Sequence, residues 1–221
     1  MRRLLNRVLA FFFPTRCLLC GRPAAVDADF LCADCAARPV ERVYRYFALR
    51  VRREMYTLEC RAPMRYREPF RSTLWRFKFR GETSLAVPLA GLMARVLADE
   101  AAQYDCIVPV PVSAERLRER GYDQSKLLAE RLSAQTGLPC RCLLRKTRDN
   151  RMQHRLTAKE RAANVRGAYA CGEADSLRVL LVDDIVTTGA TARECAAMLY
   201  RAGAAEVLCV CCAVVEANST Q

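Results

Sequence analysis

The segment from Arg178 to Arg201 constrains the fold of this chain more than any other part of the sequence. An apolar run, Val179-Leu-Leu-Val182, ends in the adjacent carboxylates Asp183 and Asp184, and a short hydroxyl-rich turn follows. The helical pattern of residues 192–201 begins directly after that turn. Such an apolar run is typical of a strand that is covered on both faces, as in a parallel sheet. The order of strand, tight loop and helix therefore predicts an α/β fold, in which ligands bind at the carboxyl ends of the strands.

The turn itself indicates what kind of ligand that would be. It consists of Thr187, Thr188, Gly189, Ala190 and Thr191. Hydroxyl groups donate hydrogen bonds, small residues let the backbone approach a ligand, and the free N–H groups and dipole of a helix start favour an anion such as phosphate. Neighbouring carboxylates would repel a phosphate, but they accept hydrogen bonds from sugar hydroxyls and can help to hold a divalent cation. The loop therefore predicts a sugar phosphate as the ligand.

The length and net charge of the chain limit the classes of protein to which it can belong. A chain of 221 residues that is 52% hydrophobic can form one α/β domain with a small appendage, and wholesale disorder is excluded. The net charge of +12 favours anionic partners such as nucleic acid, acidic lipid or pyrophosphate, although solvated surface charge explains it as well. The sequence contains neither GxxxxGK[ST] nor GxGxxG, so nucleotide-binding loops of those types have no support.

Four of the thirteen cysteines form two CxxC knuckles. Cys17 and Cys20 make the first knuckle, and Cys32 and Cys35 make the second. Two such knuckles supply the four thiolates of a tetrahedral structural zinc site; the alternative is a group of four buried free thiols. Because no convincing secretory signal precedes them, so many cysteines predict a reducing, cytoplasmic compartment.

The remaining elements are predicted from local patterns. No segment is long enough to span a bilayer, and residues 1–13 are expected to form an amphipathic helix that docks on the protein, with a membrane-surface role left open. Residues 38–67 are rich in arginine and tyrosine and alternate as short strands do, which predicts strands beside the cysteines. These form either a half-buried sheet or a surface for stacking single-stranded nucleic acid. Helices are expected over 69–81 and 83–102, and a buried strand that runs into a proline-stiffened loop is expected over 105–113.

Several motifs, taken in order, resemble the ComF family of competence-associated proteins, in which a zinc ribbon is joined to an amidophosphoribosyltransferase-like domain. The loop at residues 182–191 looks like the phosphoribosyl-pyrophosphate (PRPP) loop of type I phosphoribosyltransferases. The resemblance covers nearly the whole chain and rests on the front knuckles, Arg76-Phe-Lys78-Phe-Arg80-Gly81, Val108-Pro-Val-Pro111, Arg120-Gly-Tyr-Asp-Gln124, Gln153 with Arg155, Arg161-Ala-Ala-Asn164-Val and the acid-pair loop.

This resemblance implies a fold and a set of roles. The fold would be a type I phosphoribosyltransferase-like parallel sheet flanked by helices over 67–221, with an N-terminal helix and a small zinc-ribbon domain over 1–66. The acid pair would hold the ribose hydroxyls of Mg²⁺-bound PRPP, and the turn at 187–191 would hold its 5-phosphate. Pyrophosphate would be contacted by the loop after the first main strand and by a mobile basic stretch: Val110, Pro111, Val112, Ser113, Arg148 and Arg155.

Two details depart from the family pattern or limit it. Asp123 stands where the family usually has asparagine, which changes the polarity expected of that pocket. The region around Cys60 lacks a second pair of knuckles, so one zinc ion is expected.

Two functions remain open from the sequence. The first is phosphoribosyl transfer from PRPP to an unknown acceptor. The second is a role in DNA uptake, in which the protein binds single-stranded DNA or a competence motor protein and its PRPP site is regulatory or vestigial.

Overall fold

The computed structural model describes residues 16–23, 30–37, 41–148 and 165–215 of the chain. The helix expected over residues 1–13, and Gln153 and Arg155 of the basic stretch, lie outside this part. Among the described helices, none combines the length and the apolar character needed to cross a membrane.

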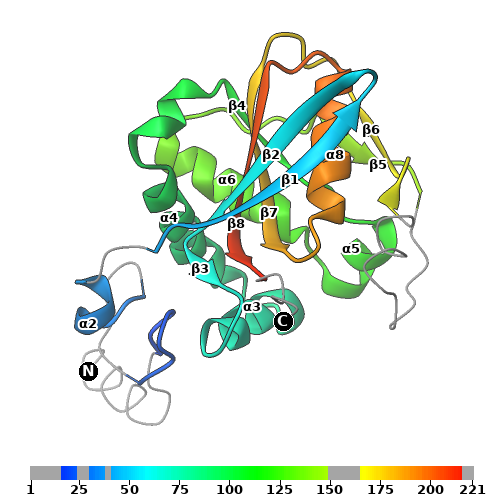
Figure 1. The fold of residues 1–221 in the computed structure, drawn as a ribbon. Helices are drawn as coiled ribbons and strands as arrows, with labels where there is room; N and C mark the ends of the chain where they lie inside the picture. Colours follow the sequence, from blue (N-terminus) through cyan, green and yellow to red (C-terminus); the bar gives the residue numbers. More distant parts are fainter. Residues whose placement is uncertain (1–15, 24–29, 38–40, 149–164, 216–221) are drawn as a thin grey trace, which may run out of the picture.

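The centre of the fold is a parallel sheet. Strands β4 (Cys106–Pro109), β7 (Arg178–Val186) and β8 (Glu206–Val214) run parallel, with β7 in the middle. The described sheet has the order β1-β2-β8-β7-β4, and the short β3 (Met64–Arg65) also pairs with β8 (Figure 1). The apolar run before the acid pair therefore forms the strand that was predicted from it, and the predicted fold class is confirmed.

The arginine- and tyrosine-rich segment forms longer strands than its pattern predicts. It folds into β1 (Val43–Val51) and β2 (Glu54–Ala62), an antiparallel hairpin of two nine-residue strands. Strand β2 pairs in parallel with β8 and extends the main sheet, and only the short β3 that follows it shares a cavity wall with Cys20 and Cys35 among the strands described here. The hairpin is held there because Leu49, Leu58 and Cys60 are buried on its inner face. The division into residues 1–66 and 67–221 stays a prediction, and in the structure these two segments share one sheet.

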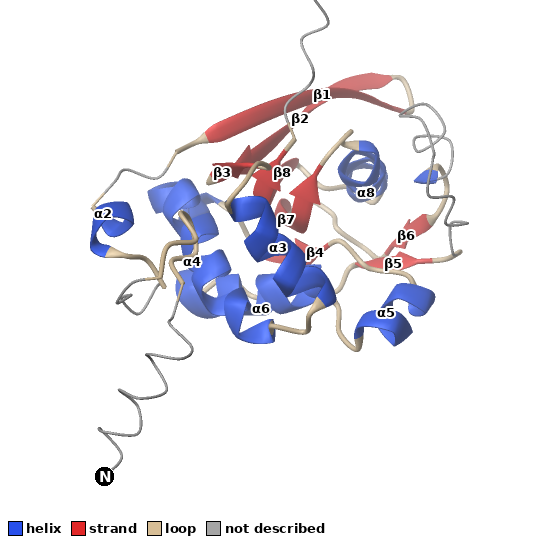
Figure 2. Cartoon of the chain, turned by 90° about the horizontal axis from the view of Figure 1, so that it is seen from below, coloured by secondary structure: helices blue, strands red, loops and turns tan. Residues whose placement is uncertain are grey.

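Helices cover the two faces of the sheet (Figure 2). One face packs against α3 (Phe70–Phe79), α4 (Ala86–Leu97) and α6 (Gln124–Thr136), and the other packs against α8 (Ala190–Arg201). Alternate residues of β7 serve the two cores. Leu180 and Val182 join the α3–α4–α6 side, whereas Val179 and Leu181 join the α8 side. A strand that is buried on both faces needs apolar side chains on both. Strand β7 has them from Val179 to Val182, directly before its acid pair.

The other elements are short. They are α2 (Ala33–Ala36), the 3₁₀ turns η1 (Thr83–Leu85) and η2 (Ala98–Gln103), α5 (Ala114–Arg120), and the two-stranded sheet of β5 (Leu144–Lys146) and β6 (Tyr169–Cys171). The helix expected over 83–102 is thus η1, α4 and η2 in succession.

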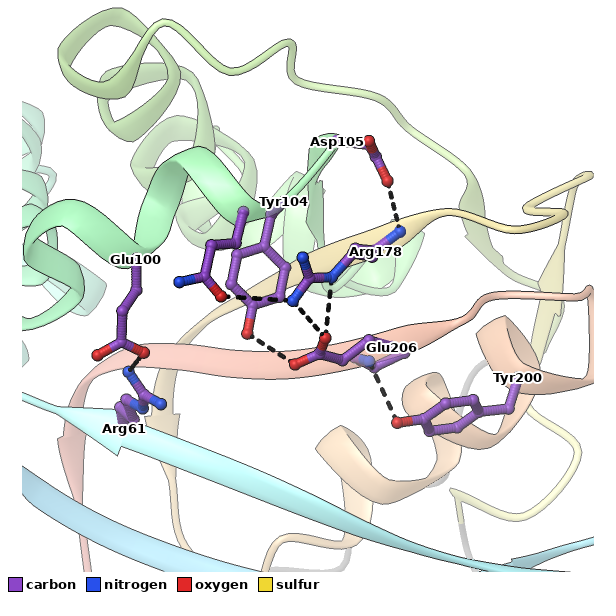
Figure 3. Close-up of polar contacts among 9 residues, drawn as sticks. Arg61, Glu100, Tyr104, Asp105, Arg178, Tyr200 and Glu206 are labelled. Atoms are coloured by element: carbon purple, nitrogen blue, oxygen red, sulfur yellow. Dashed lines mark hydrogen bonds and ion pairs between the residues drawn. The ribbon is translucent and has the colours of Figure 1, made fainter.

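A polar network holds the amino ends of the strands (Figure 3). The guanidinium of Arg178 donates from Nε and Nη2 to Oε2 of Glu206, at 2.9 and 2.8 Å, so the first residue of β7 is bound to the first residue of β8. Tyr104 donates its hydroxyl to the other oxygen of Glu206 at 3.1 Å, and the backbone N–H of Arg178 donates to Asp105 at 2.7 Å. These bonds fix where each strand starts, and consequently how far each one reaches at the opposite, carboxyl end.

Candidate functional site

The acid pair lies at the carboxyl end of β7, where two helices contact it. Oδ1 of Asp183 accepts from the Ser125 hydroxyl on α6 at 3.1 Å and from the backbone N–H of Asp184 at 2.9 Å. Asp184 is buried, and its Oδ2 lies 2.8 Å from Nζ of Lys78 on α3. Its Oδ1 accepts from the backbone N–H of Ile185 at 2.6 Å. The two carboxylates are thus held in position by the strand, by α6 and by α3.

The electrostatics of the pair favour ligands that bring hydrogen-bond donors or positive charge. Burial and the neighbouring charge of Asp184 raise the pKa of Asp183 to about 7, although Lys78 and the hydrogen bond from Ser125 act against this. Two adjacent carboxylates with a single ammonium group in contact remain strong acceptors. Sugar hydroxyls, or a divalent cation with oxygen ligands, fit this arrangement.

Lys78 and Ser125 are site residues that the sequence reasoning did not assign. Both are distant from the acid pair in sequence and reach it only because α3 and α6 pack over the same edge of the sheet. The sequence held one signal for Lys78. It is one of only four lysines in the chain, whereas the remaining basic side chains are nearly all arginines. No comparable signal in the sequence points to Ser125. Its burial becomes apparent only in the structure.

The turn after the acid pair opens onto the amino end of α8. Gly189 has a left-handed backbone, with φ +73°, and is the N-cap of this twelve-residue helix. Because a glycine has no side chain with which to cap the helix, the first N–H groups of α8 are available to an anion. The five residues of the predicted phosphate turn, Thr187–Thr191, therefore run from the end of β7 into the first two residues of α8.

Strand β1 contacts this turn from across the sheet. A Cβ atom placed on Gly189 would lie 2.4 Å from Cζ of Phe47, so the aromatic ring fills the space that any side chain would need. Nη1 of Arg45 donates to the carbonyl oxygen of Thr187 at 2.6 Å. These contacts could not be foreseen from the sequence, because they join residues about 140 positions apart.

The predicted pyrophosphate loop follows β4, next to the end of β7. Val110 is buried and donates its N–H to the carbonyl of Val182 at 2.9 Å, which fixes the start of this loop against β7. Pro111 and Val112 follow. Ser113 is the N-cap of α5, where its hydroxyl accepts from the backbone N–H of Arg116 at 3.2 Å. The loop is therefore beside the acid pair, but the Ser113 hydroxyl already has a structural partner.

Asp123 uses both of its carboxylate oxygens as acceptors. Oδ1 accepts from the N–H of Lys126 and caps α6, and Oδ2 accepts from the N–H of Val112 at 3.4 Å. Burial raises the pKa of this carboxyl group. An asparagine offers only one acceptor oxygen, so the aspartate can tie α6 to the loop after β4 in a way that asparagine cannot.

Arg148 is exposed, and its Nη2 donates to the carbonyl of Arg166 at 2.6 Å. The described contacts do not bring it to the acid pair. Arg155, which was predicted to act with it, is outside the described residues.

The four knuckle cysteines form one cluster. The Sγ atoms of Cys17, Cys20, Cys32 and Cys35 all lie within 4.8 Å of one another, and the group could hold a metal ion. Sγ of Cys20 is 3.8 Å from Sγ of Cys32, close to the roughly 3.8 Å edge of a tetrahedron with metal–sulfur bonds of about 2.3 Å. Burial opposes ionisation of Cys20, but hydrogen bonds from Arg22 lower its pKa to about 6, in favour of the thiolate that binds metal.

Comparison with known proteins identifies the family. The chain is 31% identical over 193 residues to competence protein ComFC of Bacillus subtilis (strain 168), a match that covers 86% of this chain and 73% of that protein. It is 29% identical over 220 residues to DNA utilization protein YhgH of Salmonella typhimurium (strain LT2), covering 90% of this chain and 97% of that one. The chain therefore belongs to the ComF family, the family of competence protein ComFC, as its motifs predicted.

No family model matches the chain. Among solved structures, a purine phosphoribosyltransferase from Pyrococcus horikoshii Ot3 aligns with a TM-score of 0.38 at 18% identity, over 58% of this chain and 80% of that one.

The contact between Gly189 and Phe47 makes a testable prediction about stability. We expect Gly189→Ala to lower the free energy of unfolding by more than Gly137→Ala does. Both glycines have φ near +75°, so an alanine at either position meets the left-handed penalty of about 1–2 kcal/mol. Only position 189 adds a clash, because nothing lies within 4 Å of a Cβ at Gly137. Overpacking should add at least about 1 kcal/mol in urea unfolding; equal losses would contradict the contact.

The raised pKa of Asp183 makes a prediction about pH. Between pH of about 4 and about 7, the folded protein keeps a proton on Asp183 that the unfolded chain has lost. Unfolding then releases a proton, so this group makes the free energy of unfolding fall as the pH rises, by at most about 1.4 kcal/mol per pH unit. Urea unfolding at pH 5 and pH 7 should show a smaller fall in Asp183→Asn than in the parent. Identical changes in the two proteins would rule out a raised pKa.

Proposed function

We propose that this protein binds Mg²⁺-bound PRPP and acts as a phosphoribosyltransferase on an acceptor that is still unknown. One observation carries the proposal: the acid pair, near the carboxyl end of β7, is followed by a short turn that leads directly into the glycine-capped start of α8. Carboxylates that suit sugar hydroxyls are thus a few residues away from N–H groups that suit a phosphate. A phosphoribosyl group carries both features, sugar hydroxyls and a phosphate.

The chemistry of each part follows from its charge. Asp183 and Asp184 would accept the ribose hydroxyls and stabilise the positive charge that develops at the anomeric carbon as pyrophosphate leaves. Their oxygens also suit Mg²⁺, which would neutralise charge on the leaving pyrophosphate. The backbone of Val110–Ser113, with Arg148 and Arg155, would contact the pyrophosphate. Lys78, which is in contact with Asp184, adds a cation on the same side.

A second function is supported by the relatives and by one surface. One relative is named as a competence protein, ComFC, and another as a DNA utilization protein, YhgH. In this chain, the outer face of β1 exposes Tyr44 and Tyr46, whose rings stack with centroids 6.4 Å apart, and Arg61 lies over the ring of Tyr44. Such a face could stack single-stranded DNA, and a competence motor protein is the alternative partner. Binding to an oligonucleotide that weakens steeply with salt would support this function.

The cysteine cluster is proposed as a structural zinc site. All four ligands are cysteines, which leaves no open position for catalysis. A reducing, cytoplasmic compartment is proposed with it, because paired cysteines bind metal there more often than they form disulfides.

The PRPP proposal predicts a binding result. Calorimetric titration with PRPP and Mg²⁺ should show saturable binding to the parent, and Asp183→Asn/Asp184→Asn should abolish it because the ribose hydroxyls lose their charged acceptors. Glu173→Gln/Asp175→Asn is the matched control, since it removes two exposed carboxylates ahead of the amino end of β7. Absence of binding to the folded, zinc-loaded parent would overturn the proposal and leave the DNA function in its place.

The zinc proposal predicts a metal content. The purified parent should carry about one equivalent of zinc, measured by atomic emission, and Cys32→Ser should lose it because a buried ligand is removed. The melting midpoint should then fall, by roughly 2–4 °C for each 1 kcal/mol lost in a chain of this size. Cys142→Ser, at an exposed cysteine outside the cluster, should keep both the zinc and the midpoint. Equal zinc in both variants would contradict a four-cysteine site.

A further inference from the structure

Strand β1 brings a cation to the predicted phosphate turn. Nη1 of Arg45 donates to two carbonyl oxygens, those of Thr187 and Val215, each at 2.6 Å. Thr187 is the first residue of the turn, and Val215 follows β8, so the guanidinium bridges the segments that leave the two central strands. The guanidinium carbon also lies 4.8 Å from the ring centroid of Phe47, the residue that fills the space at Gly189.

The bond to Thr187 sets the orientation of the next peptide group. A peptide unit is planar and trans, so its carbonyl and the following N–H point in opposite directions. Because Arg45 holds the carbonyl of Thr187, the N–H of Thr188 must point away from Arg45, on the side of the turn that leads to α8. An N–H fixed in this way is preorganised for an anion, because binding does not have to reorient the peptide.

Arg45 also retains its charge. Within the described residues, its guanidinium forms no ion pair, and both of its hydrogen-bond partners are neutral carbonyls. Both bonds come from the same nitrogen, Nη1, so one end of the guanidinium holds the two carbonyl oxygens together. Among the residues that the structure describes, no carboxylate pairs with this positive charge next to the turn.

We propose that Arg45 is a positioning residue for the phosphomonoester of the ligand: it holds the turn at Thr187 in the anion-binding conformation and adds positive charge beside it. The proposal rests on the proposed PRPP function and extends it, because it makes the N-terminal hairpin part of the phosphate site. The ring of Phe47 packs against the guanidinium of Arg45 and also lies against Gly189.

The test compares two ligands that occupy different parts of the site. Ribose 5-phosphate carries the phosphomonoester and no pyrophosphate, whereas Mg²⁺-pyrophosphate carries no phosphomonoester. Calorimetry on the full chain should show that Arg45→Gln lowers the affinity for ribose 5-phosphate by at least tenfold and changes the affinity for Mg²⁺-pyrophosphate by no more than about twofold. Arg50→Gln is the matched control, because Arg50 is an exposed arginine on the outer face of the same strand and should leave both affinities unchanged. Arg45→Lys keeps a positive charge and N–H donors for the same carbonyl oxygens, so it should keep more of the affinity for ribose 5-phosphate than Arg45→Gln does.

Three outcomes would overturn the proposal. If Arg45→Gln and Arg50→Gln bind ribose 5-phosphate equally well, Arg45 does not act on the phosphate site. If Arg45→Gln loses both ligands together, its role is to hold the fold rather than the turn. If the parent binds neither ligand, the proposed function itself fails, and the inference fails with it.

Discussion

The parallel pairing of β7 with β4 on one side and β8 on the other is the constraint on which the site depends. Register pairs Val182 with Pro109 and with Val210, so the last residue before the acid pair is level with both neighbours. The acid pair begins at the next residue. Because the amino ends are held by Arg178 and Glu206, β7 has little freedom to slide. The position of the two carboxylates along the strand direction is therefore set by the backbone pairing of three strands.

Helix α3 connects the cysteine cluster with the acid pair. The hydroxyl of Thr73 donates to the carbonyl of Leu18, which lies between the two cysteines of the first knuckle. Five residues further along the same helix, Lys78 contacts Asp184. The knuckle residues also pack into the core that α3 shares with α4 and α6. The small metal-binding segment is thus part of the scaffold that holds a charged side chain at the site.

The sequence predicted those parts of the site that are continuous in the chain. The strand up to Val182, the acid pair and the turn before α8 follow from local pattern, and the cysteine cluster follows from the spacing of its knuckles. The contacts of Lys78, Ser125 and Arg45 did not follow, since each depends on how a distant element packs against the sheet edge. The pairing of β2 with β8 was missed for a related reason: alternation predicts a strand but does not say which strand it joins. The structural roles of Ser113 and Asp123 as helix caps lie in loops whose geometry needs the fold.

The pairing of β2 with β8 has a consequence for any shortened form of this protein. In the whole chain, β8 has a neighbour on each side, and every residue from Val207 to Val214 is buried. A fragment that began at residue 67 would lack β1, β2 and β3 and would turn β8 into an edge strand. Its long apolar row, with three cysteines, would then offer unpaired backbone groups to a second copy, which is how exposed edges seed aggregation. The hairpin that reaches the predicted phosphate turn is, for the same geometric reason, the cover that keeps the apolar β8 from pairing with strands of other molecules.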